Sequence, residues 1–192
     1  MPFPDEPSTV TISPYLPSWP DEFEVLAARL HDALGGLAVA IDHIGSTSVP
    51  GLPAKDCVDV QVRVRPGDLE LRAADIGAAF GTLGFRRRPE PWNQEETSLG
   101  SPCRKLVFAP PPGARRCNVH VREHDAPNSR FALLFRDYLR ADASAREAWG
   151  TFKRRLSDVT PDLASYGQIK APATDILVAA AQQWAVASGR RP

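Results

Sequence analysis

The stretch His43-Ile-Gly-Ser-Thr-Ser-Val-Pro-Gly-Leu52, followed by Lys55 and by residues 57–65, decides the expected fold of this 192-residue chain. Residues 57–65 alternate in polarity, as expected for a strand with two different faces. One face carries Val58, Val60, Val62 and Val64, and the other carries Cys57, Asp59, Gln61 and Arg63. In a half-buried sheet the apolar face packs on helices, and the polar face is free to line a cleft.

A second stretch, residues 115–123, alternates in the same way. Asn118, His120 and Arg122 lie on one face of the expected strand, and Cys117, Val119 and Val121 lie on the other. Together with residues 105–109 this strand is predicted to form a hairpin around a turn at residues 110–113. We therefore expect the polar faces of two strands to contribute to one cleft.

The rest of the chain is predicted to surround these strands with helices. Apolar spacing indicates helices at 18–34 and 68–80, short strands at 37–44 and 81–88, a polar loop at 90–102, and only helices from 128 onward. The predicted organisation is an extended lead-in at 1–17, an α+β core at 18–125 and a helical annex at 126–192. The fold class is thus a mixed β-sheet backed by helices, with a C-terminal helical extension.

Composition excludes several classes of function. The 23 Lys and Arg balance the 23 Asp and Glu, so no overall field attracts nucleic acid or a membrane surface, and neither is an expected partner. No apolar run approaches the roughly 20 residues of a membrane helix. The N-terminus lacks the basic and apolar regions of a secretory signal, and three cysteines fit reduced thiols. We expect a cytoplasmic protein.

The turn after His43 has the composition of a phosphate site. Gly45 lets a ligand approach the backbone closely, and the amides and hydroxyls of Ser46, Thr47 and Ser48 can hold phosphate oxygens. Asp59 follows on an adjacent strand, where a carboxylate beside bound phosphates would hold Mg²⁺. The residues alone leave a second interpretation, in which a Ser/Gly-rich turn simply precedes a half-exposed strand aspartate.

The same residues resemble a known family. Residues 43–52, Lys55 and the strand around Asp59 are similar to the signature of the GrpB family. The similarity continues through residues 103–108, 118–121 and 130–139, Tyr166 and Lys170, and extends from Tyr15 to Trp184. Similar domains are fused to the C-terminus of actinobacterial dephospho-CoA kinases.

The resemblance implies a nucleotidyltransferase-like fold, in which a Gly-Ser turn precedes an Asp-x-Asp or Asp-x-Glu pair on a strand. Gly45, Ser46 and Asp59 match this pattern, whereas Gln61 stands where the second carboxylate is expected. Asn118 and His120 stand near the place of a third acidic residue. Transfer through two metal ions needs a clamp of carboxylates, so these departures put catalysis in question.

The candidate roles, taken from the residues and from the resemblance together, fall into three groups. Mg²⁺, with Mn²⁺ as the alternative ion, would be held by Asp59 and Gln61. The phosphate contacts would be Gly45, Ser46, Thr47, Ser48, Lys55, Arg104, Asn118 and Lys170. His120 is interpreted either as a general base or as a hydrogen-bonded partner of Asp59, and His43 as a structural histidine.

Two functions follow from this set of residues. The first is a protein that binds a nucleoside triphosphate with Mg²⁺ and transfers a nucleoside monophosphate to an unknown acceptor. The second is a catalytically inactive nucleotide- or partner-binding module related to coenzyme A biosynthesis. No Gly-Lys pair is present, so there is no P-loop and we expect no dephospho-CoA kinase activity.

Overall fold

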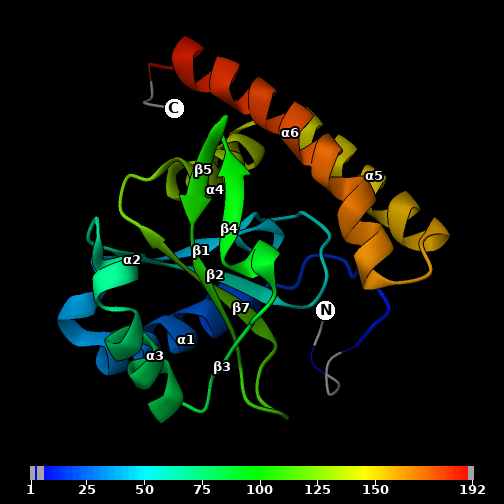
Figure 1. Cartoon of the computed structure of the whole chain (residues 1–192). Coiled ribbons are helices and arrows are strands. Elements are labelled where there is room, and N and C mark those ends of the chain that lie inside the picture. Colours follow the sequence, from blue (N-terminus) through cyan, green and yellow to red (C-terminus); the bar gives the residue numbers. More distant parts are fainter. Residues whose placement is uncertain (1–2, 4–6, 190–192) are drawn as a thin grey trace.

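The computed structural model describes residue 3 and residues 7–189 (Figure 1). Parts of the predicted lead-in and of the C-terminal end, residues 1–2, 4–6 and 190–192, lie outside the described residues. The α-helices in the described part are α1 (Trp19–Leu34), α2 (Asp68–Leu71), α3 (Ala73–Thr82), α4 (Pro127–Ala141), α5 (Ala143–Val159) and α6 (Leu163–Ala187). No helix in this part is both long and apolar enough to cross a bilayer.

The main sheet has the strand order β1-β2-β7-β6-β3. Its strands are β1 (Ala40–Ile44), β2 (Val58–Val64), β7 (Cys117–Glu123), β6 (Leu106–Ala109) and β3 (Arg86–Arg87). The central pair, β2 and β7, is parallel, and the other neighbours are antiparallel. The prediction of an α+β fold with a mixed sheet is therefore confirmed, as is the hairpin of β6 and β7.

The apolar face of the sheet carries the main core, as the alternation predicts. The four valines of β2 at positions 58, 60, 62 and 64 are fully buried beneath α1 and α3. Phe80 of α3 stacks on Phe108 of β6 with ring centroids 3.9 Å apart. These helices lie on one side of the sheet, and α5 and α6 lie on the opposite side (Figure 1).

The C-terminal helices pack on the turn that follows β1. A second core joins this turn to α4, α5 and α6, and it consists of Val49, Leu52, Phe135, Leu139, Trp149 and Val178. Arg140 of α4 donates two hydrogen bonds to the carbonyl of Ser48, at 2.9 and 2.7 Å. The predicted helical extension is confirmed, and its helices hold the turn in place. The division into parts at residue 125 stays a prediction.

The prediction of a loop at 90–102 is wrong. This region contains a two-stranded ribbon of β4 (Glu95–Ser98) and β5 (Ser101–Arg104). Leu99 and Gly100 have φ values of 51° and 78°, which suit a tight hairpin turn. The ribbon is anchored by Glu96, which accepts hydrogen bonds from the residues Lys105, Arg122 and Asn128. Because polar contacts hold it, the ribbon lacks the apolar alternation by which strands are recognised.

Three predicted boundaries also change. The helix expected at 68–80 is interrupted at Arg72, where φ is −116° and ψ is 15°, and so forms α2 and α3. The strand expected at 37–44 begins at Ala40, because Gly35–Leu37 forms a 3₁₀ turn. The strand expected at 81–88 shortens to β3, because α3 continues through Thr82.

We expect Leu139→Ala to lower the free energy of unfolding by about 2–5 kcal/mol in a single transition. Leu139 is fully buried in the core that the turn shares with the C-terminal helices, so the cavity left behind weakens both parts. Leu71→Ala is the matched control, because Leu71 is 81% exposed and should change stability by less than about 0.5 kcal/mol. Urea unfolding followed by circular dichroism measures both variants, and equal losses would contradict the expectation.

Candidate functional site

A cavity of about 330 Å³ opens on the polar face of the sheet, where β1, β2 and β7 meet the C-terminal helices. Eight of the residues predicted for the site line it: Gly45, Ser46, Thr47, Lys55, Asp59, Asn118, His120 and Lys170. The structure adds others, among them Arg122, Phe131, Phe135, Trp149, Lys153 and Tyr166. The turn, the aspartate and the polar side of β7 are thus brought together as expected.

The turn closes directly against the carboxylate of Asp59. Gly45 has φ of 68°, in the left-handed region that favours glycine. A Cβ atom added to Gly45 would lie 2.5 Å from Oδ2 of Asp59, closer than any real Cβ contact. Glycine is therefore required at this position both by its φ and by the space that Asp59 occupies.

Asp59 is supported from the neighbouring strand. It pairs in register with Asn118 of β7, and Nδ2 of Asn118 donates to Oδ1 of Asp59 at 3.2 Å. Oδ1 of Asn118 in turn accepts a hydrogen bond from Arg88 at 3.3 Å. Among the described residues that line the cavity, Asp59 alone carries a carboxylate.

Three lysines surround this single carboxylate. Lys55 precedes β2, Lys153 lies on α5 and Lys170 on α6, and all three line the cavity. Nζ of Lys55 and Nζ of Lys170 lie 6.0 and 5.9 Å from the ring centroid of Tyr166, within the range of a cation–π contact. The cavity therefore carries an excess of cationic groups and suits an anion with several charges.

Lys153 was missed by the sequence reasoning. Its side chain is buried, and Nζ donates to Oγ of Ser46 at 2.8 Å and to the carbonyl of Pro53 at 2.5 Å. Burial, and then the nearby charge of Lys170, lowers the pKa of Lys153 to about 6. No pattern could have singled it out, because the run Lys153-Arg-Arg155 reads as the solvated side of an amphipathic helix.

His120 lies in the cavity without a hydrogen bond to Asp59. Asp59 faces Asn118 in the strand register, so the partner role considered for His120 is taken by Asn118. Nδ1 of His120 is buried and has no hydrogen-bond partner in the described part of the chain. Burial, and then the charges of Arg122 and Lys105, holds the pKa of His120 well below its ordinary value. His120 is therefore neutral near pH 7.

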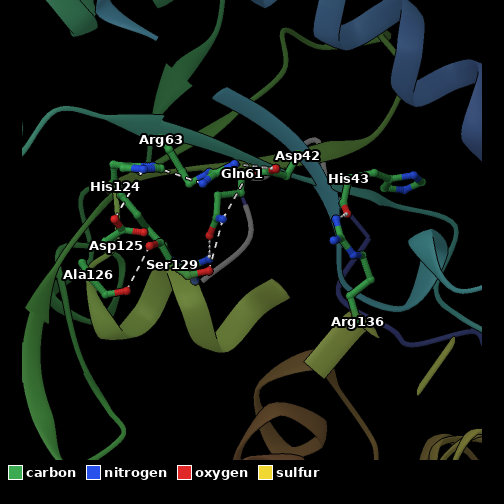
Figure 2. A network of polar contacts seen from close by, with 10 residues as sticks. Asp42, His43, Gln61, Arg63, His124, Asp125, Ala126, Ser129 and Arg136 are labelled. Atoms are coloured by element: carbon green, nitrogen blue, oxygen red, sulfur yellow. Dashed lines mark hydrogen bonds and ion pairs between the residues drawn. The ribbon is translucent and has the colours of Figure 1, made fainter. Parts of the chain in front are cut away.

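Three of the predicted site residues do not line the cavity. Gln61 is fully buried, and its Oε1 accepts a hydrogen bond from Arg122 at 3.0 Å. Its Nε2 donates to Asp42 and to the carbonyl of Ser129 (Figure 2). The amide oxygen expected to bind a metal is thus already used within the protein.

The other two are Ser48 and Arg104. The hydroxyl of Ser48 is turned back to donate to the carbonyl of Gly45 at 2.6 Å. Arg104 lies on the separate ribbon, and its guanidinium forms an ion pair with Glu70 at 3.0 Å. Neither residue lines the cavity, so the phosphate contacts expected of Ser48 and Arg104 stay predictions.

His43 has the structural role expected of it. Its ring stacks on Phe23 with centroids 4.7 Å apart, and Nε2 lies 3.0 Å from Oγ1 of Thr47. Burial, and then the charges of Arg140 and Arg136, lowers the pKa of His43 to about 4. Arg136 also donates to the carbonyl of His43 at 3.2 Å (Figure 2).

The residues of the cavity fit one Mg²⁺ ion better than two. No group of three or more His, Cys, Asp or Glu side chains able to hold a metal is found among the described residues. Mg²⁺ is commonly bound through one or two carboxylates together with substrate phosphates and water. Asp59 meets that requirement for one ion, whereas a clamp for two ions needs carboxylates that the cavity lacks.

We expect the free energy of unfolding to rise from about pH 7 to about pH 9, and to rise less in Lys153→Met. The pKa of Lys153 is about 6 in the folded protein against an ordinary value of 10.5, so between these values the unfolded chain binds more protons. Stability then increases by at most about 1.4 kcal/mol per pH unit. Urea unfolding at both pH values checks this, and equal slopes for the two proteins would contradict it. Lys170 also has a lowered pKa, about 8, but it is present in both proteins.

Comparison with known proteins shows which family the chain resembles. The sequence pattern of the family described as GrpB protein matches residues 9–179. A dephospho-CoA kinase of Mycobacterium tuberculosis is 36% identical over 193 residues, which cover 92% of this chain and 47% of the relative. A UPF0157 protein of Streptomyces coelicolor is 34% identical over 171 residues, covering 88% of this chain and 81% of the relative.

Among solved structures, GrpB from Enterococcus faecalis has a TM-score of 0.72 at 27% identity. The match covers 90% of this chain and 98% of that one. The chain spans about half the length of the dephospho-CoA kinases that it resembles. The family match covers most of the chain, and the solved GrpB structure shares its fold; the chain therefore belongs to the GrpB family.

Proposed function

We propose that the protein is a nucleotidyltransferase-like protein that binds a nucleoside triphosphate with Mg²⁺ in the cavity. The observation that carries the proposal is the closure of the Gly45–Ser46 turn on Asp59 within a cavity that three lysines also line. A phosphate chain needs close backbone approach, cationic side chains and a carboxylate for its metal ion. These three requirements are met within one cavity.

In this proposal the lysines bind the triphosphate. Lys55 and Lys170, which both lie near the Tyr166 ring, neutralise its charge, and Ser46 and Thr47 contact its terminal phosphates. A charged ligand would also favour protonation of the lysines whose pKa burial has lowered. Nucleotide binding would then be accompanied by proton uptake by the protein.

Asp59 would hold one Mg²⁺ together with the phosphate oxygens, and the ion would neutralise charge on the phosphates during the reaction. If transfer occurs, an oxygen atom of the acceptor attacks the α-phosphorus and pyrophosphate leaves. Asn118 keeps Asp59 in position, and His120 lines the same cavity as a neutral side chain whose surroundings oppose protonation. The acceptor is unidentified.

An inactive nucleotide- or partner-binding module is the second candidate, and the state of Gln61 favours it. Its amide is fully engaged within the protein, which leaves a single carboxylate where two-metal transfer uses more. Relatives named dephospho-CoA kinases suggest a link with coenzyme A biosynthesis. Either function fits the cytoplasm, where the free thiols Cys57, Cys103 and Cys117 would remain reduced.

We expect Asp59→Ala to abolish the dependence of nucleotide affinity on Mg²⁺, because Asp59 is the carboxylate of the cavity. Isothermal titration calorimetry with and without Mg²⁺ measures the difference. Asp75→Ala is the control, since Asp75 is an exposed carboxylate on α3 paired with Arg72. Equal Mg²⁺-dependent affinities in wild type and Asp59→Ala would remove Asp59 from the metal role. Pyrophosphate release in the presence of cell extract then separates an active enzyme from a binding module.

We expect Lys170→Gln to weaken nucleotide binding about 10- to 100-fold, because a charge-assisted hydrogen bond contributes about 1.5–3 kcal/mol. Arg104→Gln is the matched control, since Arg104 is paired with Glu70 outside the cavity and should leave the affinity unchanged. The same calorimetric titration measures both variants. A larger loss for Arg104→Gln than for Lys170→Gln would place the phosphates elsewhere.

A further inference from the structure

Lys153 lacks the partner that a buried lysine normally has. Its side chain is only 3% exposed, and lysine is almost never so buried unless it is paired with a carboxylate. In the part of the chain that the structure describes, its hydrogen bonds go instead to Oγ of Ser46, at 2.8 Å, and to the carbonyl of Pro53. A neutral amine satisfies this environment better than an ammonium ion does.

The contact between Lys153 and Ser46 has the geometry of an activated nucleophile. A hydroxyl becomes nucleophilic when a base lies within hydrogen-bond reach and a third group orients that base. As a neutral amine, Lys153 can keep its donation to the carbonyl of Pro53 while its lone pair accepts the hydroxyl proton of Ser46 across the same contact, and Ser46 lines the cavity. Serine–lysine pairs are a known variant of this arrangement.

We propose that Ser46 and Lys153 form a nucleophile–base pair, and that Ser46 accepts a phosphoryl group from a phosphate anhydride in the cavity. The inference goes beyond the proposed function, in which Ser46 only contacts phosphates. The cationic lining selects the electrophile, because Lys55 and Lys170 attract a phosphate group rather than a neutral ester.

The step balances with the groups present. Nζ of Lys153 takes the hydroxyl proton of Ser46, and Oγ forms a bond to the phosphorus atom. The bond from phosphorus to the bridging oxygen breaks, and the leaving group keeps the electron pair. It departs as acetate from acetyl phosphate, or as a nucleoside diphosphate from a nucleoside triphosphate. The phosphoserine then lies among Lys55, Lys153 and Lys170, whose charges stabilise it.

The surroundings of Lys153 favour its neutral form. Burial, and then the charge of Lys170 on α6, lowers the pKa of Lys153 to about 6, and Lys55 and Arg154 act in the same direction. Asp59 on β2 acts in the opposite direction. The amine is free to accept a proton above its pKa, which is about 6 before a donor binds and higher beside a bound phosphate. The rate of phosphorylation should therefore rise with pH above about 6.

The neighbouring serine provides an internal comparison. Ser48 lies two residues away in the same turn, but its hydroxyl donates to the carbonyl of Gly45, and no lysine of the described part of the chain forms a hydrogen bond with it. Ser48 is also buried, so the comparison for unselective modification is an exposed serine such as Ser144, which an unselective reagent would modify as readily as Ser46. The position of the phosphate is therefore informative by itself.

The test is to incubate the full chain with acetyl phosphate, and separately with ATP and Mg²⁺, and to locate phosphate by peptide mass spectrometry. We expect phosphate on Ser46, none on Ser48 or on the exposed Ser144, and a rate that rises with pH above about 6. Lys153→Met should reduce the rate at least about 10-fold. Lys153→Arg keeps a positive charge and a donor but cannot act as a base, so it should lose phosphorylation as well.

Circular dichroism spectra and melting temperatures identify whichever Lys153 variant is folded, and the folded variant decides the result. Absence of phosphate on Ser46 with both donors, or an unchanged rate in a folded Lys153 variant, would overturn the nucleophile–base pair. Calorimetry keeps this result separate from the proposed function. If the protein binds nucleotide but forms no phosphoserine, only the Ser46–Lys153 pair is contradicted. If acetyl phosphate yields phosphoserine but no nucleotide binds, only the proposed function is contradicted.

Discussion

The close approach of the Gly45 backbone to the carboxylate of Asp59 is the constraint on which the rest of the site depends. Asp59 fills the space where a side chain at position 45 would begin. Because glycine has no side chain, the turn can lie directly over β2. This places the hydroxyl-bearing residues of the turn beside the strand pair that carries Asp59 and Asn118. The sheet supplies the carboxylate, and the turn supplies the backbone and hydroxyl groups that surround it.

The C-terminal helices hold the turn in this position. Arg136 of α4 donates to the carbonyl of His43, just before the turn, and Arg140 donates to the carbonyl of Ser48 within it. Lys153 of α5 donates to Ser46 in the same turn. These helices also contribute Lys153 and Lys170 to the cavity lining, and Lys55 and Arg122 are its other lysine and arginine residues. The cavity is therefore a product of both halves of the chain, and a shared apolar core links their stability.

Much of the fold could be predicted because period-two alternation is a strong signal when one face of a sheet is buried, as in β2 and β7. The ribbon of β4 and β5 gave no such signal, because its anchor is the buried carboxylate of Glu96. The turn and Asp59 were predicted from local composition, whereas Lys153 is brought to Ser46 only by tertiary packing. Arg104 lies at the end of this ribbon, paired with Glu70 and outside the cavity, and its phosphate role stays a prediction.

The hydrogen bonds of Gln61 bear on how this protein differs from enzymes with two metal-binding carboxylates. The amide of Gln61 both donates and accepts, linking Arg122 on one side to Asp42 and the backbone of α4 on the other. A glutamate could not donate to either acceptor, and its charge would repel Asp42. The substitution Gln61→Glu would thus remove the side-chain bonds from position 61 to Asp42 and to the carbonyl of Ser129. A carboxylate at position 61 would keep the bond from Arg122 but lose both bonds that Gln61 donates, so replacing Asp42 as well would favour it.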